Sequence, residues 1–262
     1  MDSLVLYNHI TKENEIFKPH KDNKIVFCIK SPSIYIKPNY DHVKKFIIFD
    51  IIKNILSSYY KSVYILIIKE DPENKIEENS KLKENINIFM KSLSIMNISK
   101  PDKIILENTS NLLNNLSNIV DIYIQDIGKN ESIKIKYVIK VNGGIIHNDC
   151  TKACINIYQK EIINILFLLS DRSNFTFIEN LNKAYKIYDC INNIFKIKVS
   201  TKGPYKREEM NIIKHINKNL YNNINIDKAF DILFKYIIKR KKITYKFKIY
   251  FINLMKKFKI IS

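Results

Sequence analysis

The stretch "SPSIYIKPNYDHVKKFIIFD" (31–50) holds the side chains best placed for chemistry. It joins a strand expected at 23–31 to a helix expected at 40–60, which is the outline of a nucleotide-binding turn. The turn contains His42, but the residues that should contact a nucleotide there look unsuited to it, so the turn is either a working site of unfamiliar form or a site that has lost its chemistry. Taken alone, His42 has a second interpretation as a structural or solvated residue at the helix start.

Four cysteines, at positions 28, 150, 154 and 190, are the other candidates for chemistry. Cys150 and Cys154 lie four residues apart on an expected helix, a spacing that a metal pair could use. No nearby Cys or His completes a set of four ligands, so we favour the interpretation of both as small buried helix residues. We therefore expect no metal site.

The charge of the chain suggests an anionic partner. Its 44 Lys and Arg against 26 Asp and Glu give a net charge of +18, which suits nucleic acid. The alternative is compositional bias, because Lys, Asn, Ile, Tyr and Phe are abundant and AT-rich codons encode them. Such a composition would fit a gene of viral or parasite origin.

The tail 239–262 interleaves Lys with Tyr and Phe. Its cations could contact phosphates while its rings stack on bases. The alternative is an amphipathic terminal helix that buries those rings. The RNA-binding candidates are Lys239, Arg240, Lys241, Lys242, Lys246, Lys248, Lys256 and Lys257.

Hydrophobic periodicity predicts an α/β half followed by an all-α half. A strand at 62–70 follows the first strand and helix, and together they form a right-handed crossover unit. Further elements are expected as helices at 78–96 and 108–121, strands within 121–144, and helices throughout the remainder. The change of pattern near residue 145 predicts two domains, 1–145 and 146–262.

Features of the termini and apolar runs predict an intracellular, cytoplasmic protein with reduced thiols. The start "MDSLVLYNHITKENE" has an early Asp and no long apolar run, unlike a signal peptide. No apolar run approaches the roughly 20 residues that span a bilayer, and "IINILFLL" (162–169) predicts a buried helix.

The order of segments resembles the cysteinyl-tRNA synthetases, which are class I aminoacyl-tRNA synthetases, over nearly the whole chain. The stretch 31–50 is similar to the family pattern G-P-T-V-Y-D-x-x-H-I-G-H-A-R-x-x-x-x-F-D. Other similar segments are "LVLYNHITKENEIFKP" (4–19), "KEDPENKI" (69–76), "MKSLSIMNISKPDKIILENTSNLLNNL" (90–116), "YVIKVNG" (137–143), "IINILFLLSDRSNFTFIENLNKAYKIYDCINNIF" (162–195) and "NNINIDKAF" (222–230). The resemblance implies a Rossmann-like nucleotide-binding core, reduced here, followed by a helical-bundle domain.

Both nucleotide signatures of that family are altered. The H-I-G-H tetrad, which holds ATP, corresponds to Asn39-Tyr40-Asp41-His42, where Asp41 adds a negative charge facing phosphates. The K-M-S-K-S loop corresponds to Ile145-Ile146-His147-Asn148-Asp149, so both lysines that would neutralise the triphosphate are absent. The resemblance leaves Tyr35, Asn39, His42 and Lys44 as a vestigial ATP turn, and His147 and Asn148 as a vestigial second loop.

The zinc site that the resemblance implies is altered as well. In the family, Cys, Cys, His and Glu hold a zinc ion that binds the substrate thiolate. The first ligand falls at Lys30, with Cys28 two residues away on the same face of the expected strand. The segment that carries the other ligands, G-G-x-D-L-x-F-P-H-H-E-N-E, is missing, so we do not expect zinc.

By this resemblance, the residues that pack the fold are similar to those of the family. The two nucleotide signatures and the zinc ligands differ from it. The sequence predicts a catalytically inactive cysteinyl-tRNA synthetase-like protein that needs no cofactor. Its expected partner is a tRNA-like RNA or another protein, and homo- or hetero-oligomers are an open alternative. The alternative function is a divergent active ligase using ATP, cysteine and tRNA, with His42 and Lys44 near the phosphates. A third hypothesis is nucleotide binding without aminoacyl transfer.

Overall fold

The computed structural model describes residues 3–31, 40–69, 79–107, 112–126, 134–141, 159–169, 177–196, 199, 204–238 and 243–261. Two compact units make up the chain. The sheet unit is Tyr7–Lys152, and the helical unit joins Met1–Leu6 to Ala153–Ser262. The boundary expected at residue 145 lies outside the described residues, so the division into 1–145 and 146–262 stays a prediction.

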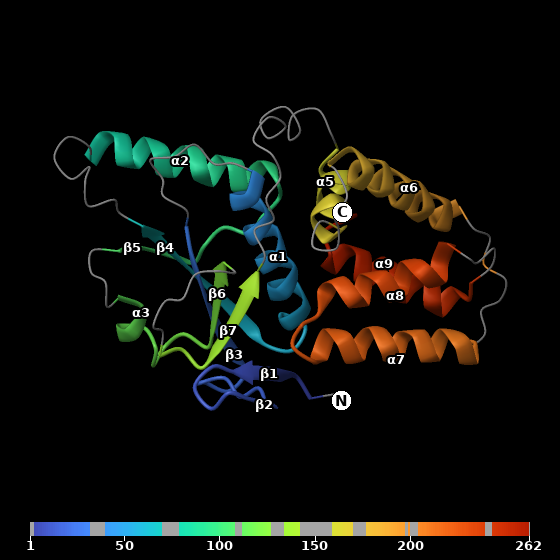
Figure 1. Ribbon diagram of the computed structural model, residues 1–262, viewed down its shortest axis with the longest axis horizontal. Helices are drawn as coiled ribbons and strands as arrows, with labels where there is room; N and C mark the ends of the chain where they lie inside the picture. The colour runs from blue at the N-terminus through green and yellow to red at the C-terminus, as the bar shows by residue number, and fades with distance from the viewer. Residues whose placement is uncertain are drawn as a thin grey trace. The chain divides into compact units, whose positions relative to one another are not determined.

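A seven-stranded, mostly parallel sheet is built from described residues of the first half of the chain (Figure 1). Its strands are β1 (Val5–Asn8), β2 (Glu13–Ile16), β3 (Lys24–Lys30), β4 (Lys61–Lys69), β5 (Lys103–Glu107), β6 (Ile122–Asp126) and β7 (Tyr137–Val141). Their order is β2-β1-β7-β6-β3-β4-β5, and β1 pairs with β7 in the antiparallel sense. The predicted α/β fold class is confirmed.

The middle strand of the five parallel ones, β3, has a nearly continuous apolar run, "KIVFCIK", as expected of a parallel strand covered on both faces. The chain passes from β3 to β4 and β5 on one side, and then returns to the other side as β6 and β7. The strand order therefore reverses between β3 and β6. In open α/β sheets, ligands bind outside the carboxyl ends of the strands at such a point.

Helices cover the two faces of the sheet differently. On one face Phe49 of α1 (Tyr40–Leu56) contacts Phe27 and Tyr64, with ring centroids 5.7 and 4.6 Å apart. The next helix is α2 (Asn79–Ile95), which contacts α1 through a pair of phenylalanine rings. Cys28 points to the opposite face, where it packs in an apolar cluster with Leu113 of the short α3 (Leu112–Asn115).

The structure corrects the helix expected at 108–121. The described helix there is only Leu112–Asn115, followed by a turn. Polar side chains in this segment bond to nearby backbone groups: the Ser117 hydroxyl donates to the carbonyl oxygen of Asn114, and Asn114 Oδ1 accepts from the N–H of Lys134. Such bonds compete with helical ones and end the helix early. Strands β1, β2 and β5 were not among the predicted elements.

The described helices of the second unit follow the predicted pattern. They are α5 (Lys160–Leu169), α6 (Phe177–Lys196), α7 (Arg207–Tyr221), α8 (Ile226–Ile238) and α9 (Tyr245–Lys257). Aromatic contacts join α8 to the end of the chain: Phe230 contacts Phe258, and Tyr236 contacts Phe247. The start of the chain belongs to this unit too, because the N–H of Asn223 donates to the carbonyl oxygen of Val5.

Candidate functional site

Several of the predicted site residues lie outside the described part of the chain. These are Tyr35, Asn39, His147 and Asn148, together with Lys239, Arg240, Lys241 and Lys242. The backbone of His42 and Lys44 lies in the first turns of α1, just after β3 in the chain. The roles proposed for these residues therefore stay predictions.

Described side chains do gather at the carboxyl ends of the parallel strands. Lys30, the last residue of β3, places its Nζ 2.7 Å from Oε1 of Glu107, the last residue of β5. Strand β4 lies between them, so the ion pair reaches across a whole strand. The side chains are only 17% and 13% exposed, so water screens their attraction much less than that of a surface pair.

A second lysine fastens the end of β3 to α1. Lys45 is buried, and its Nζ donates to the carbonyl oxygen of Lys30 over 2.9 Å. The ammonium also lies 5.9 Å from the centroid of the Phe46 ring, within the range of a cation–π contact. The carboxyl end of β3 therefore holds two ammonium groups, that of Lys30 itself and that of Lys45, which is bound to the Lys30 backbone. This strand end lies next to the reversal of strand order.

Gln125 of β6 adds a buried donor at the same edge. Ile29 and Ile124 are in register, so the next residues, Lys30 and Gln125, are neighbours on one face of the sheet. Gln125 is buried, and its Nε2 atom has no hydrogen-bond partner among the residues that the structure describes. An unsatisfied buried amide is costly, so this edge carries a local polar cost.

The residues at this edge do not fit the zinc ion that the resemblance implies. The ligand position holds the Lys30 ammonium, which repels a divalent cation, and its carboxylate neighbour Glu107 is already paired. Cys28 is fully buried in the apolar cluster, and burial raises the pKa of its thiol well above the ordinary value. Zinc binds the thiolate form. The part of the chain that the structure describes contains no group of three His, Cys, Asp or Glu side chains able to hold a metal.

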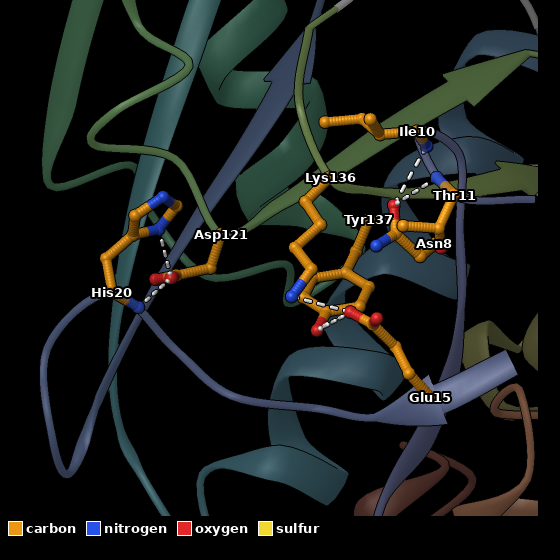
Figure 2. A network of polar contacts seen from close by, with 8 residues as sticks. All are labelled: Asn8, Ile10, Thr11, Glu15, His20, Asp121, Lys136 and Tyr137. Carbon is orange, nitrogen blue, oxygen red and sulfur yellow. Dashed lines mark hydrogen bonds and ion pairs between the residues drawn. The ribbon is translucent and has the colours of Figure 1, made fainter. Parts of the chain in front are cut away.

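The amino end of the sheet has a different polar arrangement, in which an aspartate that precedes one strand bonds to the backbone of the neighbouring strand and to His20. Figure 2 shows its contact with His20. Asp121 donates its N–H to the carbonyl oxygen of Val26, and its Oδ2 accepts from the N–H of Val26 over 2.7 Å. Oδ1 accepts from the N–H of His20, and the ring Nδ1 of His20 lies 2.6 Å from it. Asp102 clasps Tyr64 of β4 in the same two-bond manner.

His20 and Asp121 are residue types that could form an acid–base dyad, but their contacts indicate a structural role. The Asp121 side chain is 2% exposed, and both oxygens accept from backbone N–H groups. The carboxylate is therefore committed to holding the chain before β3 against the start of β6. The sequence offered a signal that we did not use: an Asp directly before a short apolar strand at both sites.

A second network in Figure 2 joins β2 to the start of β7. Glu15 Oε1 lies 2.6 Å from Nζ of Lys136 and accepts from the Tyr137 hydroxyl over 2.7 Å. Hydrogen bonds from Lys136, and then from Tyr137, lower the pKa of Glu15 to about 2. The tight turn after β1 is closed by Asn8, whose Oδ1 accepts from the N–H groups of Ile10 and Thr11. These contacts also hold the fold together.

In the helical unit, the described part of the basic tail is anchored by a buried carboxylate. Glu209, in the first turn of α7, is fully buried and accepts from the N–H and the hydroxyl of Thr244, at 2.8 and 2.6 Å. The same hydroxyl oxygen accepts from the N–H of Phe247 and caps α9. Glu209 also accepts from the N–H of Lys206. These bonds therefore hold the start of α9 against the start of α7.

Three phenylalanines of the tail are buried: Phe247, Phe251 and Phe258. These three rings are not available to stack on bases, as the alternative of an amphipathic helix expects, whereas the ring of Tyr245 is exposed. The candidate lysines differ in their surroundings. Lys246 and Lys256 are exposed, whereas Lys248 donates to the carbonyl oxygen of Phe195 near the end of α6. Lys257 is half-buried, which lowers the pKa of its ammonium.

Comparison with known proteins points to one kind of enzyme. No protein-family model matches the sequence. The cysteine–tRNA ligase of Encephalitozoon cuniculi is 26% identical over 191 residues, which cover 69% of this chain and 36% of that protein. The ligase of Pyrococcus horikoshii is 28% identical over 109 residues, covering 38% of this chain and 23% of the relative.

A third similar protein is the cytoplasmic cysteine–tRNA ligase of Gallus gallus. It is 34% identical over 74 residues, which cover 28% of this chain and 10% of the relative. The matched regions therefore span from 10% to 36% of these three relatives. Together with the α/β fold, they agree with the likeness carried by the motifs: this chain resembles the cysteinyl-tRNA synthetases and is a synthetase-like protein that spans only part of the length of these relatives.

Proposed function

We propose that this cysteinyl-tRNA synthetase-like protein binds RNA and does not catalyse aminoacylation. The observation that carries the proposal is the exposed side of α9. Lys246, Ile249, Asn253 and Lys256 are exposed at intervals of three and four residues, so they share one face of the helix. The two lysines stand about 15 Å apart along this face.

The chemistry of that face suits a phosphate backbone. Lysine ammonium groups neutralise phosphates and release counterions, and the chain as a whole carries a net charge of +18. Because the phenylalanines of the tail are buried, binding through this face would rest on charge more than on stacking. The relatives are named as cysteine–tRNA ligases, which supports a tRNA-like molecule as the RNA.

The absence of catalysis is supported by residues that differ at the positions resembling both nucleotide signatures. Asp41 occupies the position of the glycine in H-I-G-H, and no lysine occurs in the segment 145–149 that corresponds to K-M-S-K-S. A carboxylate near phosphates raises the energy of the bound nucleotide, and a lost transition-state contact lowers the rate by ~10²–10³. We expect these two changes together to abolish adenylate formation.

RNA binding is tested by titrating the full chain with labelled tRNA at several salt concentrations. The double variant Lys246→Gln/Lys256→Gln should bind several-fold more weakly. The slope of its log binding constant against log salt concentration should become shallower, as expected for the loss of about two phosphate contacts. The matched control is Lys100→Gln/Lys103→Gln, which removes two exposed lysines of the sheet unit. Deletion of 239–262 is a poorer test, because it would remove Phe247, Phe251 and Phe258 from the core.

Equal loss in both double variants would mean that RNA responds only to the total charge, and unchanged binding in Lys246→Gln/Lys256→Gln would reject α9 as the RNA-binding face. In either case the search would move to protein partners. Circular dichroism of each variant checks that the helices are retained.

Catalysis is tested by cysteine-dependent ATP–pyrophosphate exchange, with tRNA present and zinc added. We expect no exchange above background. The alternative, a divergent active ligase, requires exchange that disappears in His42→Ala and persists in His215→Ala, a matched exposed histidine of α7. The third hypothesis requires saturable ATP binding without exchange, again lost on substitution of His42 and Lys44.

A further inference from the structure

We propose that the Lys30–Glu107 ion pair stands where cysteinyl-tRNA synthetases hold their zinc ion, so that an internal salt bridge replaces the metal and this sheet edge binds no zinc. The inference goes beyond RNA binding, because it concerns the sheet unit and a metal ion, whereas the proposed RNA-binding face lies in the helical unit. It rests on the position of the pair, the charges around it and the burial of the nearest thiol.

The resemblance puts the pair beside the position of the missing metal. By that resemblance Lys30 falls at the position of the first zinc ligand, and in the structure it ends β3 beside the reversal of strand order. Glu107 ends β5, two strands away, which is about 10 Å at ordinary strand spacing. The lysine and glutamate side chains together cover this distance and meet at 2.7 Å. Residues far apart in the sequence are thus tied together across β4.

The charges around the pair oppose a divalent cation. Lys30 brings one ammonium, and Lys45 brings a second to the carbonyl oxygen of the same residue. The Glu107 carboxylate, which a metal would use as an oxygen ligand, is occupied by Lys30. Gln125, next to Lys30, presents a buried N–H donor that has no partner among the described residues. This edge therefore presents donors and cations, whereas a zinc site needs electron-pair donors.

The nearest thiol cannot replace the lost ligand without disrupting the core. Cys28 lies two residues before Lys30 and is in register with Ile65 and Tyr123, both buried. Its surroundings are apolar, and thiolate formation there is disfavoured by burial. To bind zinc, the thiolate would have to form inside the hydrophobic cluster or leave it, and either change opposes folding.

The stability of single and double variants distinguishes a coupled ion pair from two independent surface charges. Removing one member of a mostly buried pair leaves the other charge without its partner, whereas removing both leaves no uncompensated charge. Lys30→Met and Glu107→Gln should each lower the thermal midpoint of the full chain by roughly 5 °C or more. The double variant should lose no more than either single one. Lys61→Met, at an exposed lysine that starts β4, is the control and should stay within about one degree.

Zinc is measured directly on the same proteins. The wild-type chain and the variants Cys28→Ala and Glu107→Gln are incubated with zinc, passed through gel filtration and analysed for bound metal. We expect equal metal content in all three. A stoichiometric zinc ion that is lost in Cys28→Ala or Glu107→Gln would overturn the proposal. Zinc that persists in both variants would lie elsewhere in the chain and leave the proposal intact.

The two measurements fail independently. Strictly additive thermal shifts in Lys30→Met and Glu107→Gln would show that the side chains do not act as a pair, and this would reject the salt bridge. The zinc measurement does not require Lys30→Met to fold. Neither result depends on tRNA binding, so failure of this inference and failure of the proposed RNA function are distinguishable.

Discussion

The two ends of the parallel strands are held by different chemistry. At the amino end, Asp102 and Asp121 bond to backbone groups of the neighbouring strand. At the carboxyl end, Lys30 and Glu107 depend on each other across β4. A carboxylate that clasps the backbone stabilises the strand whatever side chain its neighbour carries. An ion pair needs two particular side chains. The carboxyl end of the strands therefore depends more on the residue types of this chain than the amino end does.

The largest expected effect is at the amino end. Asp121→Ala leaves the buried N–H of Val26 without an acceptor and removes both contacts of His20, so it should lower the free energy of unfolding by about 2–4 kcal/mol. Asp102→Ala is the matched control. Asp102 is exposed, so water can take its place, and the loss should be about 1 kcal/mol or less. Urea denaturation measures both values.

Hydrogen exchange adds a local readout, because protection of the Val26 amide should fall in Asp121→Ala and persist in Asp102→Ala. Equal losses in the two variants would contradict the role of burial and make the clasps interchangeable.

A smaller effect of opposite sign is expected at the carboxyl end. Gln125 is a buried amide with an unsatisfied donor, so Gln125→Met removes a cost while keeping a similar volume. We expect the variant to be more stable than wild type by about 1 kcal/mol in urea denaturation. Gln159→Met, at an exposed residue, is the control and should change stability little. If Gln125→Met destabilises the chain, the amide has a polar partner in solution and this edge holds a polar ligand.

The smallest expected effect depends on pH. The folded state lowers the pKa of Glu15 from its ordinary 4.5 to about 2, so the contribution of its contacts is complete above about pH 4.5. It is lost as the pH falls toward 2, because the proton then binds the folded carboxylate. The thermal midpoint of wild type should exceed that of Glu15→Gln by no more than a few degrees above pH 5, since the pair is partly exposed to water.

That difference should shrink between pH 4.5 and 2, which a series of thermal scans measures. Glu13→Gln, an exposed neighbour in β2, provides the comparison and should show no such change. A difference that stays constant down to pH 2 would mean that the contacts of Glu15 do not depend on its charge.

Elements with a strong hydrophobic period were predictable, and those held by polar contacts were less so. The run "KIVFCIK" and the apolar stripe of α1 predicted the central crossover correctly. The region 108–121 looked helical because its leucines recur at helical spacing, yet the Ser117 hydroxyl bonds to the nearby carbonyl oxygen of Asn114 and the described helix α3 ends early. The strand β5 was missed because "KIILE" is short and lies at an edge of the sheet.

The same distinction applies to the candidate site. The family resemblance predicted that Lys30 falls at an altered ligand position, but nothing in the sequence paired it with Glu107, 77 residues away. The tail was identified as basic from its composition. Only the structure separated the exposed Lys246 and Lys256 from Lys248, which bonds to α6.

The sequence by itself determined the α/β class, the helical second half, the altered signature residues and the likeness to cysteinyl-tRNA synthetases. These properties follow from local periodicity and residue identity, which need no knowledge of distant contacts. Tertiary structure decided which charges are paired, which rings are buried and which carboxylates clasp the backbone. Those outcomes depend on strand order and register, because parallel neighbours bring together residues that are distant in the chain.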